Sequence, residues 1–141
     1  MRVSGETDLK TLLRTMQPEA RAGAYEFVSA TAPTPEEIAS AIAVVHEDEG
    51  VTLVRPTAES AVDAMACITL TVHSSLQAVG LTAAVATALA ERGIACNVVA
   101  GFHHDHLFVP WARRTDAIAA LTELAPDPGC FPEPDVAQST P

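Results

Sequence analysis

The chain has 141 residues, enough for one ordinary domain or for two very small ones that share a core. Eight Lys and Arg residues stand against 18 Asp and Glu, and the formal net charge of -10 argues against nucleic-acid binding, which needs clustered basic residues. No apolar run approaches the roughly 18 residues of a membrane span, and the N-terminus has polar residues where a signal peptide needs its apolar centre. These features predict a cytoplasmic protein with neither nucleic-acid nor membrane partners.

The first half opens with a predicted helix and a predicted strand. Thr7 or Asp8 is a suitable N-cap for the helix. Apolar residues follow the cap at helical spacing, namely Leu9, Leu12, Leu13 and Met16. Residues 23–30, with the sequence GAYEFVSA, predict the strand.

A long helix is expected over residues 33–50. Thr34 would be its cap, Pro35 would take the first position, and Gly50 would end it. The spacing of three apolar residues predicts its buried stripe: Ile38, Ile42 and Val45. A short strand, VTLVRP, and a short helix or linker, TAESAVDA, complete the first half.

The second half repeats this style with clearer signals. The segment ACITLTVH alternates between apolar and polar residues, which is typical of a half-buried strand. LTAAVATALAERG predicts a helix that ends at Gly93, with a core-facing stripe of Leu81, Val85, Ala88 and Leu89. IACNVVAGFH is apolar on both faces except at Asn97 and predicts a central strand. HLFVPW then predicts another strand, and RRTDAIAALTEL a second amphipathic helix.

The order of these elements predicts an α+β, ferredoxin-like fold, with an antiparallel sheet and helices on one face. We expect two small modules, residues 1–63 and 64–125, followed by a proline-rich disordered tail, residues 126–141. The second module lacks its final strand. Either its sheet has three strands, or a strand from the first half fills the gap.

No catalytic motif is present in the sequence. A GxSxG elbow, a P-loop and a GxGxxG pattern are all missing. The three cysteines, Cys67, Cys96 and Cys130, have no CxxC spacing, and the first two lie in apolar runs where a thiol usually behaves as a small hydrophobic group. We therefore expect a protein that is not an enzyme and that needs no cofactor.

A run of potential ligand or catalytic side chains, His103, His104, Asp105 and His106, lies at a predicted turn between two strands. Neighbouring residues of a strand point to opposite faces, so these four side chains do not converge on one metal ion by themselves. His73 on the neighbouring strand could add a ligand, which leaves a metal site formed by His73, His103, His104 and His106 as an alternative. A polar hairpin tip is the simpler interpretation.

Gly80 precedes the Ala-rich helix and is a second candidate for a binding site. A glycine at this point allows a polar group to approach the backbone, and the free N–H groups of a first helical turn favour a carboxylate. Glycine before a helix is also commonly no more than a turn.

The segments SSLQAVGLTAAVATALAERGI and CNVVAGFHHDHLFVP, in this order, resemble the ACT domain, an amino-acid-sensing module. The resemblance is closest to small bacterial proteins with two ACT modules, which are similar to aspartokinase regulatory domains and to eukaryotic arginine-sensing ACT proteins. It implies ferredoxin-like modules paired side by side, a homodimer, and a small-molecule ligand, most simply an amino acid, at the seam between modules.

The resemblance also implies which residues bind the ligand. The loop before the helix would hold the carboxylate and amine of an amino acid, and here it comprises Ala78, Val79, Gly80 and Leu81. The next strand would supply the amide of Asn97, and the hairpin would supply His103, His104 and Asp105. An Asp at this place could pair with a cationic side chain, as in arginine or lysine. A purely structural or protein-interaction module remains an alternative.

Overall fold

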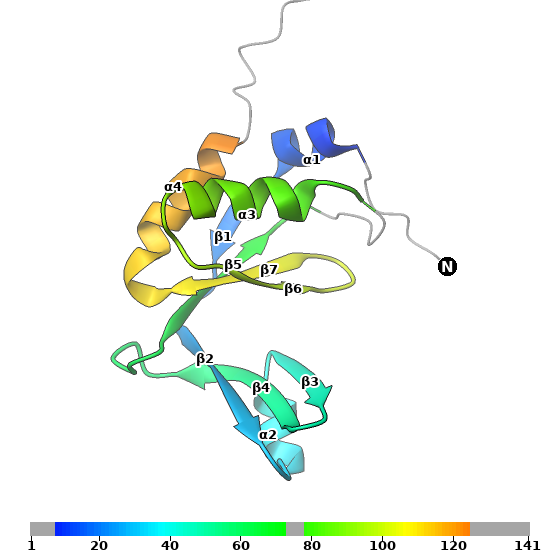
Figure 1. Cartoon of the computed structure of the whole chain (residues 1–141), viewed down its shortest axis with the longest axis vertical. Helices are drawn as coiled ribbons and strands as arrows, with labels where there is room; N and C mark the ends of the chain where they lie inside the picture. The colour runs from blue at the N-terminus through cyan, green and yellow to red at the C-terminus, as the bar shows by residue number, and fades with distance from the viewer. Residues whose placement is uncertain (1–7, 73–77, 125–141) are drawn as a thin grey trace, which may run out of the picture.

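The computed structural model describes residues 8–72 and 78–124. In chain order its elements are α1 (Leu9–Thr15), β1 (Pro18–Ala20), β2 (Ala24–Ala30), α2 (Pro35–Ser40), β3 (Ala43–Glu47), β4 (Gly50–Thr57), β5 (Met65–Leu70), α3 (Leu81–Glu91), β6 (Asn97–Ala100), β7 (Asp105–Pro110), a 3-10 turn (Trp111–Arg113) and α4 (Arg114–Leu124) (Figure 1). Within these residues, no helix is both long and apolar enough to cross a membrane.

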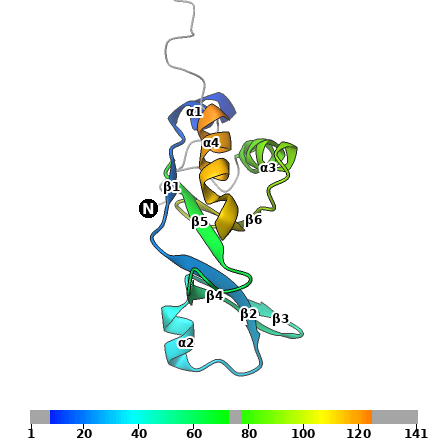
Figure 2. The ribbon, with the colours of Figure 1, turned by 90° about the vertical axis from the view of Figure 1, so that its left-hand side faces the viewer.

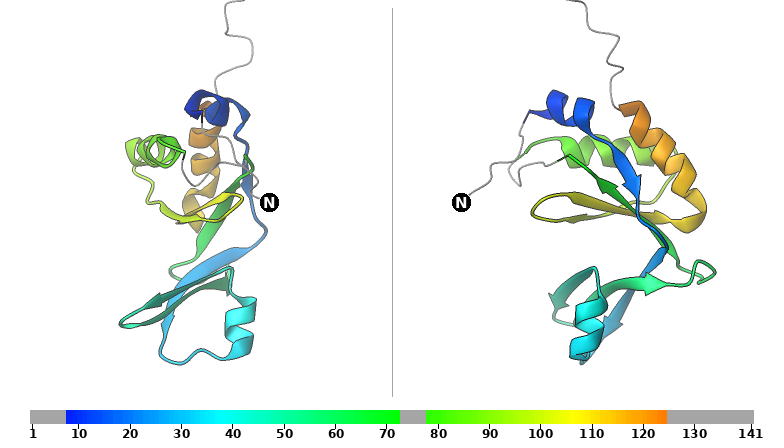
Figure 3. Two further views of the ribbon diagram at one scale, coloured as in Figure 1. Left: turned by 90° about the vertical axis from the view of Figure 1, so that its right-hand side faces the viewer. Right: turned by 180° about the vertical axis from the view of Figure 1, so that it is seen from behind.

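The strands form one seven-stranded antiparallel sheet in the order β3-β4-β2-β5-β7-β6, and β1 pairs with β5. This arrangement confirms the predicted α+β, ferredoxin-like class. The two halves of the sheet meet at β2 and β5, which share the single residue pair Tyr25 and Met65. From this junction the β3–β4 and β6–β7 hairpins project to the same side of the molecule (Figure 3).

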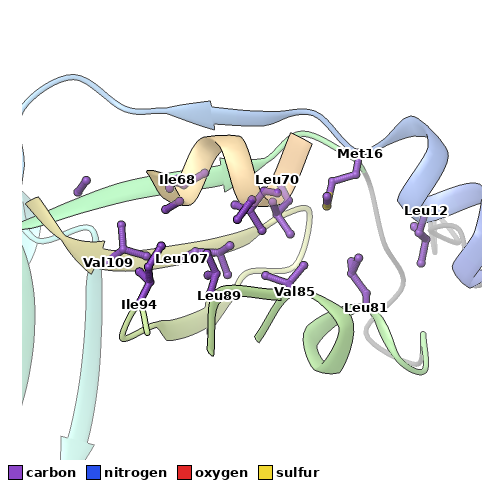
Figure 4. Packing of buried hydrophobic residues seen from close by; sticks show 14 residues of the cluster. Leu12, Met16, Ile68, Leu70, Leu81, Val85, Leu89, Ile94, Leu107 and Val109 are labelled. Atoms are coloured by element: carbon purple, nitrogen blue, oxygen red, sulfur yellow. The ribbon is translucent and has the colours of Figure 1, made fainter. Parts of the chain in front are cut away.

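The second half contains the main core. Helices α3 and α4 cover one face of β5 and β7, and α1 packs beside them (Figures 1 and 2). The largest fully buried side chains of this core are Leu12, Met16, Ile68, Leu70, Val85, Leu89, Leu107, Val109 and Leu121 (Figure 4). The predicted stripe of α3 is buried at Leu81, Val85 and Leu89, as apolar residues at helical spacing require.

The missing strand of the second half is β1, so the second of the two alternatives left by the sequence is correct. Pro18, Glu19 and Ala20 lie opposite Leu70, Thr69 and Ile68. The segment PEA carries no strand signal because Pro, Glu and Ala are all poor strand formers. Its conformation is set by the unpaired edge of β5, which offers backbone groups that must find partners.

The long helix predicted over residues 33–50 is wrong beyond its first turns. Thr34 and Pro35 begin α2 as expected, and Thr34 forms a complete capping box with Glu37. The helix ends at Ser40, however, and β3 follows it and pairs with β4 along its whole length. Residues 42–45 contain Ile and Val, whose branched side chains favour a strand once a pairing partner is available. Gly50 begins β4, and Val45 of the supposed buried stripe is exposed.

The prediction of a central strand at IACNVVAGFH is also wrong, because β6 is an edge strand that pairs only with β7 among the described strands. Its apolar character has another origin. Val98 packs against the main core, and Val99 packs on the opposite face with a smaller cluster around Tyr25 and Phe108. Each face of β6 therefore carries one partly buried valine, although one edge of the strand has no partner in the described chain.

Candidate functional site

The loop before α3 has the backbone geometry of an uncapped helix start. Gly80 is the N-cap, with φ at 97° in the left-handed region, and no side chain of the described residues caps the helix. The first helical hydrogen bond runs from the Ala84 N–H to the Gly80 carbonyl, so the N–H groups of residues 81–83 have no acceptor within the helix. The first turn of α3 contains no acidic residue that would compete for an anion. A carboxylate fits these donors chemically.

The four loop residues differ widely in exposure. Leu81 is buried in the core and anchors the helix start, whereas Val79 is 83% exposed. Ala78 packs partly against the core. Of these four residues, Val79 is therefore the one that presents a largely exposed side chain.

Leu9 of α1 adds a wall that the sequence analysis did not foresee. A Cβ atom placed on Gly80 would lie 3.0 Å from Leu9 Cδ2. Glycine is favoured here because its φ is positive, and a Cβ would in addition be in tight contact with the end of the Leu9 side chain. No sequence signal links residues 9 and 80, since their contact depends on how α1 packs on α3.

The β6–β7 hairpin lies at the same end of the sheet as the start of α3 (Figure 1). The His104 Nδ1 atom is 3.3 Å from the Val72 carbonyl oxygen, at the C-terminal side of β5. Asp105 begins β7 opposite Ala100 and precedes the core residue Leu107 by two positions, so its side chain leaves from the face that the helices cover. His103 is exposed at the tip, with its ring edge-on to Phe102.

Asn97 is not part of this arrangement within one chain. It lies opposite Phe108 at the start of β6, three residues before the hairpin end, which is about 10 Å along a strand. Its neighbour Val98 faces the helices, so the exposed Asn97 side chain faces the other way. The structure thus brings the Gly80 loop, His104 and Asp105 to one end of the sheet and leaves Asn97 at its free edge.

His106 belongs to the helix-free face. Its Nδ1 atom is 2.9 Å from the Thr69 Oγ1 atom, across the β5–β7 pair. Burial lowers the pKa of His106 below its usual value, and the positive charges of Arg21 and His104 lower it further, while Asp105 opposes them. The imidazole is therefore neutral near pH 7.

Within residues 8–72 and 78–124, no group of three or more His, Cys, Asp or Glu side chains is placed to hold a metal ion. His73 lies outside the described residues, as does Cys130. Burial raises the pKa of the Cys67 and Cys96 thiols, which disfavours the thiolate that metal binding or nucleophilic attack would need.

Several solved structures are similar to this chain. A Vibrio cholerae protein, described as a protein of unknown function and a possible transport protein, is 44% identical, with a TM-score of 0.71; the match covers 83% of this chain and 95% of that one. An Agrobacterium tumefaciens protein is 18% identical, with a TM-score of 0.63 over 78% of this chain and 89% of the other, and supports the fold alone. No functionally curated protein gives a significant match.

Two family models, both described as ACT domain, match in tandem. The first covers residues 4–67 and the second residues 64–123, so that together they span nearly the whole described chain. ACT domains are generally regulatory modules that bind small molecules, and they often form dimers. This chain belongs to the ACT domain family.

Proposed function

We propose that this protein is a non-catalytic sensor that binds an amino acid reversibly in the cytoplasm. The observation that carries the proposal is the start of α3 at Gly80, whose first N–H groups have no acceptor within the helix, at the same end of the sheet as His104 and Asp105. The backbone of residues 78–81 would hold the α-carboxylate. Asp105, with His103 and His104 beside it, would contact the ligand side chain, and a carboxylate there favours a cationic side chain such as that of arginine or lysine.

The proposal also includes a homodimer, which the free edge of β6 supports. An exposed edge strand normally carries a charge, a proline or a bulge that prevents pairing with other chains. Residues 97–100 read Asn-Val-Val-Ala and contain no charge and no proline. A second copy that pairs with this edge would extend the sheet. Asn97 would then lie at the seam between two copies, where its amide could bind the α-amine of a ligand.

A thermal-shift screen with the twenty amino acids tests the proposal. A ligand at about a hundred times its dissociation constant adds roughly 2.7 kcal/mol to the free energy of unfolding. We expect one amino acid, or a few related ones, to raise the melting temperature, and Asp105→Asn to weaken the effect of a cationic ligand. Asp116→Asn, an exposed change in α4, is the matched control and should leave the shift intact.

The outcome against the proposal is a screen in which no amino acid raises the melting temperature. A variant of Gly80 is a poor probe of binding, because any side chain there would meet Leu9 and strain the backbone even without a ligand. Analytical ultracentrifugation tests the dimer separately, and a strictly monomeric protein would remove that part of the proposal.

A further inference from the structure

Residues 8–20, which comprise α1 and β1 and are called the N-terminal arm below, belong to the first half in sequence but pack on the second half of the protein. Leu12 and Met16 are fully buried in the core that α3 and α4 cover. β1 pairs with β5 and packs beside α4 (Figure 2). The backbone N–H and the hydroxyl of Thr71 both donate to the Gln17 carbonyl, which fixes the arm at one more point.

The arm is joined to β2 by a short exposed bulge. β1 and β2 lie along the same edge of β5, because β7 occupies the other edge. The Arg21 N–H donates to the Cys67 carbonyl, and Tyr25 lies opposite Met65. From Arg21 to Tyr25 the chain advances by four residues, whereas the matching stretch of β5, from Cys67 to Met65, advances by two. Two residues of the connection therefore have no partner on β5 and form the bulge.

Gly23 sets the shape of this bulge. Its φ is 77°, in the left-handed region, and nothing lies within 4 Å of the position that a Cβ would take. The residue is therefore not held by packing, and only its own conformational freedom allows the bulge. An extended backbone at this point would shift the arm by two residues, about 7 Å, relative to its partners on β5.

We propose that the N-terminal arm is exchangeable, and that the Gly23 bulge decides whether it docks on its own chain or on the β5 edge of a second copy. An exchanged arm would make the same contacts with β5 and the core as it makes now, so the two forms differ mainly at the connection. With the bulge, the arm stays in register with the β5 strand of its own chain. With an extended connection, the register with its own β5 is lost, and the equivalent edge of another copy is the surface that fits it. This inference is independent of ligand binding.

Gly23→Val tests the proposal, because a β-branched residue strongly disfavours a positive φ but would meet no neighbour here. The matched control is Gly93→Val. Gly93 also has a positive φ, 66°, and open space at its Cβ position, but it ends α3 and is not connected to the arm. Each variant is unfolded and refolded as an equal mixture of 15N-labelled and 13C-labelled chains, and isotope-filtered NOEs are recorded between β1 and β5.

We expect NOEs between different chains linking Glu19 with Thr69 in Gly23→Val, and none in Gly93→Val. If Gly23→Val folds with only intrachain β1–β5 NOEs, the arm is not exchangeable and the proposal fails. If Gly23→Val does not fold, the same labelled mixture of the wild-type protein is refolded at high concentration instead. The absence of interchain β1–β5 NOEs in that sample also overturns the proposal. A dimer formed through β6 would not produce this signal, because β1 lies on the far side of β5 from β7 and β6.

Discussion

Leu12→Ala is the sharpest test of the packing, because it asks which half of the protein the first helix stabilises. Leu12 has no exposed surface and lies in the core of the second half. Truncation of a fully buried leucine costs about 2–5 kcal/mol, through lost burial and the cavity that remains. With an m-value of about 2 kcal/mol/M for a domain of this size, the urea midpoint should fall by about 1–2.5 M.

Trp111 provides the assay, because it is the chain's one tryptophan and lies in the second half, where its backbone N–H donates to the Ala64 carbonyl. Its fluorescence should follow unfolding of that half directly. Leu13→Ala is the control, since Leu13 lies in the same helix but is only partly buried and should cost clearly less. A change of less than about 0.5 kcal/mol in the transition that Trp111 reports would show that α1 does not support this core, and would refute the reasoning.

Three further predictions concern individual groups. Because the folded-state pKa of His106 is lowered, the native state binds fewer protons than the unfolded state at acidic pH. The free energy of unfolding should therefore fall as the pH drops below about 6.5. Thermal melts between about pH 7.5 and pH 5 should show a weaker pH dependence in His106→Gln than in the wild type. Cys67 is fully buried, so in a Cys96→Ser, Cys130→Ser background its thiol should react with a disulfide reagent only under unfolding conditions, and rapid native labelling would contradict its placement. The Glu26–Arg55 ion pair, at 2.9 Å, is about one-third exposed, and a double-mutant cycle should give a coupling of no more than about 1 kcal/mol, which a much larger value would contradict.

The elements that the sequence predicted well are those whose signals are local. The Asp8 cap and the apolar spacing after it identify α1, and the Thr34 capping box identifies the start of α2. The stripe of α3 and the alternation of β5 follow from the periods of a helix and a strand. The order of the Gly80 loop, the helix and the histidine hairpin was sufficient to indicate the ACT family, since it does not depend on long-range contacts.

The candidate site was only partly predictable. The Gly80 loop and the β6–β7 hairpin share one end of the sheet. This placement can be inferred from the order of elements, because that order gives the strand directions and the direction of α3. That Asn97 lies at a free edge, away from Gly80, depends on which strand pairs with which. Leu9 enters the site solely because α1 packs on α3, and no pattern near residue 9 indicates it.

The sequence by itself determined the class of fold, the helix starts and the strands whose own residues favour them. Tertiary structure alone decided three further points: residues 43–47 form a strand, residues 18–20 complete the second half, and β6 is an edge. The physical reason is the same in each case. Strand pairing joins residues that are far apart in the chain, so no short window of sequence contains the edge with which a segment will pair. Pairing with β4 makes residues 43–47 a strand despite the helical spacing of Ile38, Ile42 and Val45. Pairing with β5 makes a strand of Pro-Glu-Ala.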